Sequence, residues 1–404
     1  MGSGREIERR KKMKVLALNS GSSSLKYQLY EMPEEQVLVS GGFERIGIEG
    51  SFYTIKIKGN KEEINTNLPN HAEALSILLD ELVKRGIVGN LSEIKGVGHR
   101  IVQGGDYYSK STIIDDDLIN KVEELSVLAP LHNPAGLTGV KAAKELIKEG
   151  VNVAVFDTAF HQTIEEENYL YPVPYSWYKD YKVRKYGFHG TSHNFLSNRI
   201  SEILGEENKI ITCHIGNGAS ISAIKNGKCI NTSMGLTPNA GVMMGTRSGD
   251  IDATIITYLM GKTGMNEKEI DNALNKQSGV LGISEKSSDL RDIEDGIANN
   301  DKRCILAHNM YVNKIVDYIA RYFIELGGAD AIVFTGGVGE RSPLTREKVL
   351  KKLEVLGVKI DLEKNKIKAE ETLITTEQSK IKVYVIPTDE ELMIARDTYN
   401  LIKE

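Results

Sequence analysis

The chain contains few cysteines. Only Cys213, Cys229 and Cys304 occur among its 404 residues, and none belongs to a Cys-x-x-Cys pair. Structural zinc sites are commonly built from such pairs, so the sequence predicts none. Because unpaired cysteines are typical of a reducing compartment, we expect a cytoplasmic protein.

Long apolar runs and a large charge of one sign are also absent. No apolar run approaches the ~20 residues of a membrane helix, and the net charge of −5 indicates no polyanionic partner. We therefore expect no membrane and no nucleic acid among the partners. Residues 1–12 are charged and lack the apolar core of a signal peptide, so we interpret them as an N-terminal extension or a remnant of an expression sequence. The remaining length suffices for two domains.

A turn rich in serine and glycine lies at residues 19–26, Asn-Ser-Gly-Ser-Ser-Ser-Leu-Lys, after an apolar strand. A Walker loop would place Gly-Lys-Ser/Thr at the start of a helix, whereas the alternation of Leu25, Tyr27 and Leu29 indicates a second strand. Free backbone N–H groups and hydroxyls in such a hairpin could bind a phosphate, with Lys26 as a point charge. An ordinary serine-rich turn explains this octapeptide alone equally well.

Two later segments favour the phosphate interpretation. Residues 211–222 repeat the plan of strand, glycine-containing turn and strand, which predicts a duplicated fold. A third glycine cluster at residues 335–340 follows an apolar strand and precedes a helical pattern, so a nucleotide could lie against its backbone. Three such clusters together predict a nucleotide-binding cleft.

Strand and helix patterns alternate along the whole chain, which predicts an α/β fold. Apolar spacing and capping residues predict a strand at 151–156 and a crossover between domains around 158–186. The expected helices span residues 70–85, 117–128, 134–147, 192–204, 302–326, 344–356 and 389–402.

Charged residues near the ends of predicted strands are the candidates for chemistry, because open α/β sheets bind ligands there. Asp157 ends an apolar strand, although a turn or helix-capping role explains it equally well in isolation. Arg100 and Arg247 each lie between glycines. A single arginine of this kind is more often part of a surface ion pair, but two favour an anionic substrate.

Two histidines stand four residues apart at His189 and His193. They lack the intervening glutamate of a zinc-binding helix, so we reject a metal pair. We expect His189 to donate a hydrogen bond to developing charge and His193 to be structural. Near the C-terminus, Thr388 and Glu391 have the spacing of a capping box, which leaves Glu390 as the freer carboxylate.

With these motifs in view, the chain resembles the acetate kinase family, in the superfamily of acetate and sugar kinases, Hsc70 and actin. The resemblance covers residues 13–404. It is carried by ten motifs in order, namely residues 19–26, 98–100, 130–134, 156–161, 186–193, 214–218, 244–250, 288–291, 336–340 and 390–391.

The resemblance implies an α/β fold of two duplicated RNase H-like (actin-like ATPase) domains flanking a nucleotide cleft. Residues 13–157 would form the first domain, and residues 158–386 the second, which would bind the nucleotide and mediate dimerisation. The C-terminal helix, residues 387–404, would pack back on the first domain. Members of the family are homodimers, so a homodimer is expected.

The implied activity is reversible transfer of the γ-phosphoryl group of ATP to acetate by direct in-line displacement, giving acetyl phosphate and ADP. The implied cofactor is Mg²⁺, with Mn²⁺ able to substitute, held at Asn19 and Glu390. Arg100 would bind the acetate carboxylate, Arg247 and His189 the transferring phosphoryl group, and Asp157 would be the catalytic carboxylate. Since a carboxylate nucleophile is already ionised at neutral pH, Asp157 would position groups and would not need to remove a proton.

The resemblance also assigns binding residues. The nucleotide would be bound by Lys26, His214, Ile215, Gly216, Asn217, Gly218, Asp289, Leu290, Arg291, Gly337, Val338, Gly339, Glu340 and Arg341. A small apolar pocket for the methyl group would be formed by Val102, Leu131, Phe188 and Pro238. Taken alone, the segment around Asp289 also reads as a simple helix cap.

Four residues differ from the family pattern. Gln103 stands where histidine is common, Asn239-Ala240 where Leu-Glu is common, and Arg341 where asparagine is usual. Nucleotide and acyl-chain preference are therefore open. The alternatives are a propionate or butyrate kinase of the same fold and, in another class, an ATP-gated binding module like Hsc70 or actin, because fold does not fix function.

Overall fold

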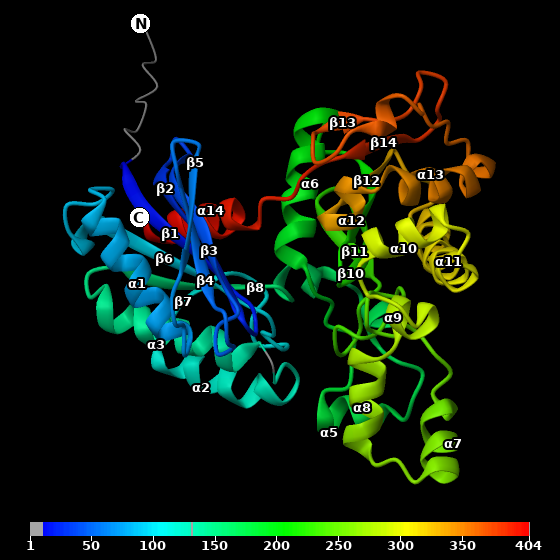
Figure 1. The fold of residues 1–404 in the computed structure, drawn as a ribbon, viewed down its shortest axis with the longest axis horizontal. Helices are drawn as coiled ribbons and strands as arrows, with labels where there is room; N and C mark the ends of the chain where they lie inside the picture. Colours follow the sequence, from blue (N-terminus) through cyan, green and yellow to red (C-terminus); the bar gives the residue numbers. More distant parts are fainter. Residues whose placement is uncertain (1–10, 131, 404) are drawn as a thin grey trace, which may run out of the picture. The chain divides into compact units, whose positions relative to one another are not determined.

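The computed structural model describes residues 11–130 and 132–403, and the chain divides into two compact units (Figure 1). One unit contains the residues up to Ala159 together with Asp389–Glu404, and the other contains Phe160–Thr388. The predicted domain boundaries, 157/158 and 386/387, each lie two residues before the observed ones.

The first unit is built on an eight-stranded sheet in the order β5-β4-β3-β2-β1-β6-β8-β7. Strands β1 to β5 pair antiparallel in sequence, whereas β6 pairs parallel with β1, and β8 with β6. The strands are β1 Met13–Ser20, β2 Ser24–Met32, β3 Gln36–Glu44, β4 Phe52–Ile57, β5 Asn60–Asn65, β6 Ile94–Ile101, β7 Thr112–Ile113 and β8 Val151–Phe156.

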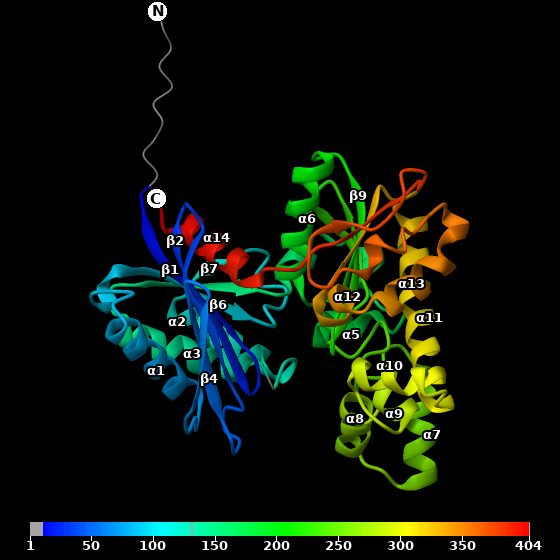
Figure 2. The ribbon, with the colours of Figure 1, turned by 45° about the horizontal axis from the view of Figure 1, so that its top comes forward.

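Helices cover both faces of this sheet because successive strand residues point to opposite sides. In β1, Leu16 and Leu18 pack with the core beneath α1 and α3, whereas Val15 and Ala17 pack with α14. Figure 2 shows α14, the C-terminal helix, lying on the sheet of this unit. The helices are α1 His71–Lys84, α2 Asp116–Glu124, α3 Asn133–Leu146 and α14 Glu390–Ile402.

The second unit repeats this plan in a six-stranded sheet of order β11-β10-β9-β12-β14-β13. Strands β9, β10 and β11 form an antiparallel meander, and β12 and β14 add parallel strands on the other side of β9. In both units, strands with the same roles therefore occur in the same order, and the predicted duplicated α/β fold is confirmed. The strands are β9 Lys209–Ile215, β10 Ala219–Lys225, β11 Lys228–Thr232, β12 Ala331–Thr335, β13 Thr372–Leu373 and β14 Lys382–Val385.

Helices α6 and α11 lie on opposite sides of this second sheet (Figures 1 and 2). Leu196 and Ile200 of α6 pack on the strand residues Ile210 and Val333. Within the described parts of the chain, no helix combines the length and apolar character needed to cross a membrane. The helices are α4 Glu166–Tyr169, α5 Tyr175–Tyr181, α6 Gly190–Leu204, α7 Thr254–Thr263, α8 Glu267–Lys276, α9 Gly279–Ser284, α10 Leu290–Ala298, α11 Lys302–Glu325, α12 Gly336–Arg341 and α13 Pro343–Lys352.

Three element predictions need correction. The glycine cluster after β12 is itself the short helix α12, and the helix expected at 344–356 begins at Pro343 and ends at Lys352. The helix expected at 117–128 ends at Glu124 and continues as a 3₁₀ turn. The remaining 3₁₀ turns are η1 Leu91–Glu93, η3 Ala159–Thr163, η4 Glu354–Leu356 and η5 Lys364–Lys366, with η2 at Leu125–Val127.

Candidate active site

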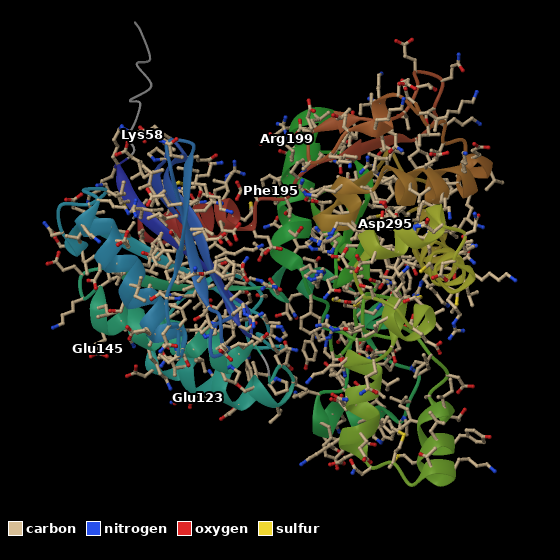
Figure 3. All side chains as sticks on the ribbon, in the orientation of Figure 1. Lys58, Glu123, Glu145, Phe195, Arg199 and Asp295 are labelled. Atoms are coloured by element: carbon tan, nitrogen blue, oxygen red, sulfur yellow. The ribbon has the colours of Figure 1, made fainter. Side chains whose placement is uncertain are left out.

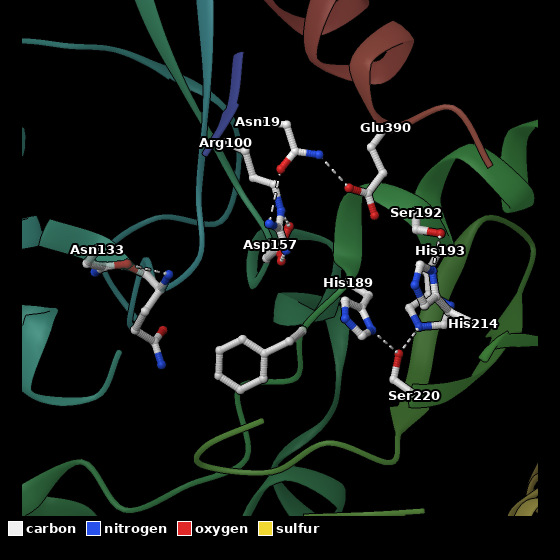
Figure 4. A network of polar contacts seen from close by, with 12 residues as sticks. Asn19, Arg100, Asn133, Asp157, His189, Ser192, His193, His214, Ser220 and Glu390 are labelled. Atoms are coloured by element: carbon white, nitrogen blue, oxygen red, sulfur yellow. Dashed lines mark hydrogen bonds and ion pairs between the residues drawn. The ribbon is translucent and has the colours of Figure 1, made fainter. Parts of the chain in front are cut away.

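Five polar side chains meet at one edge of the first unit's sheet, and we call Asn19, Arg100, Asp157, Glu390 and Glu391 the Arg100 cluster. Figure 4 labels the first four of them. Asn19 lies at the end of β1, Arg100 near the end of β6, and Asp157 directly after β8. These three strands run parallel, so their carboxyl ends lie together. Helix α14 begins at Glu390 and brings two more carboxylates to the same edge.

The Arg100 cluster is joined by a continuous set of hydrogen bonds. Arg100 holds Asp157 with two parallel contacts, Nε to Oδ1 at 3.0 Å and Nη2 to Oδ2 at 2.5 Å. Arg100 Nη1 also donates to Asn19 Oδ1 at 3.2 Å. The Asn19 amide nitrogen in turn donates to Glu390 Oε2 at 2.9 Å and to Glu391 Oε1 at 3.0 Å. Asn19 therefore connects the guanidinium to the two glutamates.

This cluster holds more negative than positive charge. Burial alone would lower the pKa of Arg100, but the carboxylates of Asp157, Glu390 and Glu391 raise it above its ordinary value, so the guanidinium stays charged. Burial, followed by repulsion from Glu390, raises the pKa of Glu391. Three carboxylates facing one guanidinium provide a site that a further cation would stabilise.

The prediction that Glu391 forms a capping box with Thr388 is wrong. The residue that caps α14 is Asp389, whose Oδ1 accepts from the backbone N–H of Leu392 at 2.9 Å. Because the helix begins one residue later than expected, the Glu391 side chain is released from capping and contacts Asn19. Glu391 is thus a member of the cluster that the sequence interpretation missed.

In the second unit, Arg247 and His189 lie beside the turn between β9 and β10. A Cβ atom on Gly218 of this turn would lie 3.4 Å from Arg247 Nη1 and 3.7 Å from His189 Cε1. The only hydrogen bond to oxygen found for the Arg247 guanidinium among the described residues goes to the carbonyl of Pro238, at 3.4 Å. Burial lowers the pKa of Arg247. A half-buried cation without a carboxylate partner in the described chain is suited to bind an anion.

A hydrogen-bonded group of histidines orients His189 (Figure 4). His189 Nδ1 lies 2.9 Å from Ser220 Oγ, and His193 Nε2 lies 2.8 Å from the same oxygen. His193 Nδ1 also contacts Thr212 Oγ1 at 2.7 Å. Burial, with the nearby His161 and His214, holds the pKa of His193 well below its usual value, so this ring is neutral. His193 therefore supports Ser220, which in turn fixes the ring of His189.

The backbone of His189 is also constrained. Its φ of 58° and ψ of 26° lie in the left-handed region, which residues other than glycine enter at a cost. Helix α6 begins at the next residue, Gly190, and the His189 ring stacks on His214 with centroids 4.2 Å apart. This conformation is held by contacts on two sides of the ring.

A cavity of about 400 Å³ lies in the second unit between α10, α12 and the turn after β9. Eight of the predicted nucleotide residues line it, namely Gly216, Asn217, Asp289, Leu290, Arg291, Gly337, Val338 and Arg341. Three further lining residues, Ser288, Glu294 and Ser342, were not predicted. Glu294 lies one helical turn beyond Leu290 on α10, and this spacing could have identified it.

The other predicted nucleotide residues do not line this cavity. Lys26 belongs to the first unit. His214 Nδ1 contacts Ser192 Oγ at 2.8 Å, and Glu340 Oε1 accepts from the backbone N–H of Gly336 at 2.9 Å, so Glu340 holds the turn in place. Ile215 and Gly339 pack against each other beneath the turn, and Gly218 lies at Arg247.

Asp289 has two contacts that agree with both earlier interpretations. Its Oδ1 accepts from the backbone N–H of Arg291 at 2.9 Å, which caps α10, and its carboxylate pairs with the Arg291 guanidinium. Hydrogen bonds from Arg291 lower the pKa of Asp289. The residue is therefore a helix cap that also lines the cavity.

The four residues expected to surround a methyl group are distributed over both units. Val102 is buried in the first unit, whereas Phe188 and Pro238 belong to the second. Leu131 lies outside the described residues. Next to Val102, Gln103 is fully buried and its amide nitrogen has no hydrogen-bond partner among the residues that the structure describes.

Comparisons with known proteins give consistent matches. A family model described as the acetokinase family matches residues 14–396. An acetate kinase of Thermotoga maritima is 53% identical over 400 residues, which cover 97% of this chain and 99% of that protein. The crystal structure of a Porphyromonas gingivalis acetate kinase is 48% identical, with a TM-score of 0.90 and coverage of 96% and 99%. A propionate kinase structure from Francisella tularensis is 40% identical, with a TM-score of 0.91 and the same coverage.

Proposed function

This chain belongs to the acetokinase family, and from this premise we propose that it transfers the γ-phosphoryl group of ATP reversibly to acetate, giving acetyl phosphate and ADP. The observation that carries the proposal is Arg247, a half-buried guanidinium without a carboxylate partner in the described chain, which lies with His189 beside the turn that lines the nucleotide-sized cavity. A transferring phosphoryl group supplies the anion that this cation lacks.

On the acceptor side, we propose that Arg100 binds the acetate carboxylate. Its guanidinium has the fork geometry that suits a planar carboxylate, and it already holds that of Asp157 with two parallel contacts. Asp157 would then hold Arg100 in the orientation that presents its remaining N–H groups. No general base is needed, because acetate is ionised at neutral pH.

On the donor side, we propose that Arg247 and His189 contact the γ-phosphoryl group. Charge spreads over its oxygens as transfer proceeds, so fixed donors aimed at these oxygens lower the barrier. The contacts of His189 with Ser220 and His214 fix its ring before substrate arrives. Such preorganisation avoids the cost of orienting the ring during the reaction.

The oxygen-rich Arg100 cluster fits a divalent cation. Mg²⁺ binds proteins through one or two carboxylates and keeps several waters. It therefore does not need a cage of three His, Cys, Asp or Glu side chains, and the described residues hold no such group. We propose that Asn19 and Glu390 hold Mg²⁺, or Mn²⁺ in its place, and that the ion would neutralise charge on the phosphate oxygens of ATP. Chelation with EDTA should abolish turnover, and either ion should restore it.

We also propose a cytoplasmic homodimer. The three cysteines are buried and free, which supports a reducing compartment. Dimerisation rests on the family resemblance, and light scattering on the full chain would reject it by giving the mass of one chain.

The decisive experiment measures acyl phosphate formed from Mg·ATP and acetate, trapped with hydroxylamine, for the parent and Arg100→Ala. Propionate and butyrate are run in parallel, because one structural relative is a propionate kinase and one methylene changes binding by only ~1–3 kcal/mol. We expect acetate to be the best acceptor and the variant to lose at least 100-fold in kcat/KM, from the roughly 3 kcal/mol of a lost charged contact.

Arg199→Ala is the matched control, because Arg199 pairs with glutamates at an exposed position of α6 (Figure 3). Its activity should stay within twofold of the parent. No acyl phosphate from any of the three acids, with ATP still hydrolysed, would instead support an ATP-gated binding module.

A further inference from the structure

The cavity of the second unit has two chemically different ends. At one end, glycine backbones are close together, since a Cβ atom on Gly216 would lie 3.8 Å from the backbone nitrogen of Gly337. At the other end, one helical turn further along α10 and α12, the lining consists of Glu294, Arg341 and Ser342. Exposed backbone N–H groups suit phosphates, whereas an ionised carboxylate repels them. Glu294 therefore lies at the end where the nucleoside is expected.

A chain of hydrogen bonds connects Glu294 to a lysine. Ser342 Oγ donates to Glu294 Oε1 in a short contact and lies 2.7 Å from Thr345 Oγ1. Thr345 Oγ1 lies 3.0 Å from His308 Nε2, and His308 Nδ1 lies 3.2 Å from Lys348 Nζ. The chain thus passes from the cavity through three buried side chains to the ammonium group of Lys348.

The direction of this chain is fixed at its lysine end. The ammonium of Lys348 can only donate, so His308 Nδ1 accepts and its Nε2 carries the hydrogen that Thr345 receives. Burial and the charge of Lys348 lower the pKa of His308 to about 4, which keeps the ring in this neutral form. Ser342 Oγ is the donor both to Thr345 Oγ1 and to Glu294 Oε1, so its single hydroxyl hydrogen is shared between these two oxygens. The contact with Ser342 holds the Glu294 side chain in one orientation.

One carboxylate oxygen of Glu294 therefore already accepts a hydrogen bond within the protein. Its Oε1 accepts from Ser342, whereas its Oε2 has no hydrogen-bond or ion-pair partner among the residues that the structure describes. A carboxylate held in one orientation with one acceptor oxygen available is suited to recognise a neutral donor group of a ligand.

We propose that Glu294 recognises the nucleoside part of the nucleotide by accepting a hydrogen bond from one of its neutral donors, a ribose hydroxyl or the exocyclic amino group of adenine. The inference rests on the proposed function, because it assumes that this cavity takes ATP and ADP. The chain from Lys348 positions Glu294 and does not touch the ligand.

Equilibrium binding of ADP to the full chain, measured by titration calorimetry, tests this inference. We expect Glu294→Gln to bind ADP roughly tenfold more weakly, since a charged acceptor is replaced by a neutral one. Asp295→Asn is the control, because Asp295 is an exposed neighbour on α10 outside the cavity lining and loses the same charge (Figure 3). Its affinity should stay within twofold of the parent.

Three ADP analogues identify the donor. The compounds 2′-deoxy-ADP and 3′-deoxy-ADP each lack one ribose hydroxyl, and IDP lacks the amino group of adenine. The parent should bind one of them roughly tenfold more weakly than ADP, and Glu294→Gln should discriminate less between that analogue and ADP, because its neutral amide oxygen accepts a weaker hydrogen bond from the same donor. A deoxy analogue would identify the ribose, and IDP the base.

The inference would be overturned if, for all three analogues, the loss of binding free energy caused by Glu294→Gln simply added to the loss caused by the analogue. If Glu294→Gln does not fold, Lys348→Gln tests the same contact from outside the cavity. This variant should reduce the preference for ADP over the same analogue two- to threefold. Binding losses that do not add, in a protein that forms no acyl phosphate, would reject the proposed function alone. Normal acyl phosphate formation with additive losses would reject only the role of Glu294.

Discussion

Arg100 and Arg247 show how differently two half-buried arginines can be used. Arg100 has compensating carboxylates, which raise its pKa, whereas Arg247 has none among the described residues and burial lowers its pKa. An uncompensated charge that is partly removed from water reduces stability, and we propose that Arg247 occupies this position because it binds an anion. The sequence shows that both residues lie between glycines, but this pattern could not distinguish the paired arginine from the unpaired one, because the partners are remote in the chain.

Lys185 offers a test of buried charge away from the candidate site. Burial, followed by repulsion from Arg321, lowers the pKa of Lys185 to about 8. Since the folded pKa is below the unfolded value of about 10.4, this group favours folding fully above pH 10, and that contribution is lost as the pH falls through 8. At pH 7 the charged amine therefore destabilises the fold. We expect Lys185→Met to unfold at a higher temperature than the parent at pH 7, by several degrees, with a smaller gain at pH 9.5.

Thermal unfolding followed by circular dichroism at both pH values measures this difference. In the parent, Lys185 Nζ donates to Asn231 Oδ1. This oxygen keeps a hydrogen bond in the variant, because it also accepts from the backbone N–H of Thr232 at 2.8 Å. Lys179→Met is the control, since Lys179 is exposed on α5. A gain that is equal at pH 7 and pH 9.5 would show that the effect comes from packing and not from the charge.

At the scale of elements, apolar periodicity predicted the helices that cover the sheets but missed those that do not. Helix α7 buries none of its residues, so its sequence carries no amphipathic signal, and α9 is only six residues long. Helix α12 consists largely of glycine, whose low helix propensity indicated a loop, yet Gly339 packs on Ile215 and Phe334. Tertiary packing decided these elements, and a sequence window cannot show it.

The contact between β6 and α14 supports the Arg100 cluster from behind. A Cβ atom on Gly98 would lie only 2.5 Å from Ile394 Cγ2 and within 3.1 Å of the Ile394 carbonyl oxygen. Only glycine allows the helix to approach the strand this closely. We expect Gly98→Ala to lower the free energy of unfolding by about 1–3 kcal/mol through overpacking, and to weaken acetate binding because both Arg100 and Glu390 are displaced.

Urea unfolding of the full chain and the KM for acetate measure the two effects of Gly98→Ala. Gly261→Ala is the matched control, because no atom lies within 4 Å of its added methyl group and it lies inside α7, where alanine is the better helix former. The control should be slightly stabilised with its KM unchanged. If Gly98→Ala is destabilised but its KM for acetate is unchanged, the packing of β6 on α14 does not support the Arg100 cluster.

At the scale of the whole molecule, the duplicated plan was readable from the sequence because each copy contains a strand, a glycine-containing turn and a strand. The turn after β1 and the turn after β9 occupy the same place in the two sheet orders. The duplication did not reveal which unit contributes which candidate site residues. Arg100 and Glu390 belong to one unit and Arg247 to the other, and only the long-range strand pairing assigns them.

This division has a consequence for the reaction. Direct transfer needs the acceptor oxygen within about 3–3.5 Å of the phosphorus, so in the proposed reaction the carboxylate bound by Arg100 and the phosphate bound by Arg247 lie next to each other at the moment of transfer. We expect ADP and acetate together to reduce the radius of gyration measured by small-angle scattering, because closure of domains over substrates is a common way to exclude water. Acetate should add compaction beyond that of ADP in the parent but not in Arg100→Ala, which lacks the proposed acetate ligand. An unchanged radius with both ligands bound at saturating concentration would contradict closure, and transfer would then have to occur without any large rearrangement of the two units.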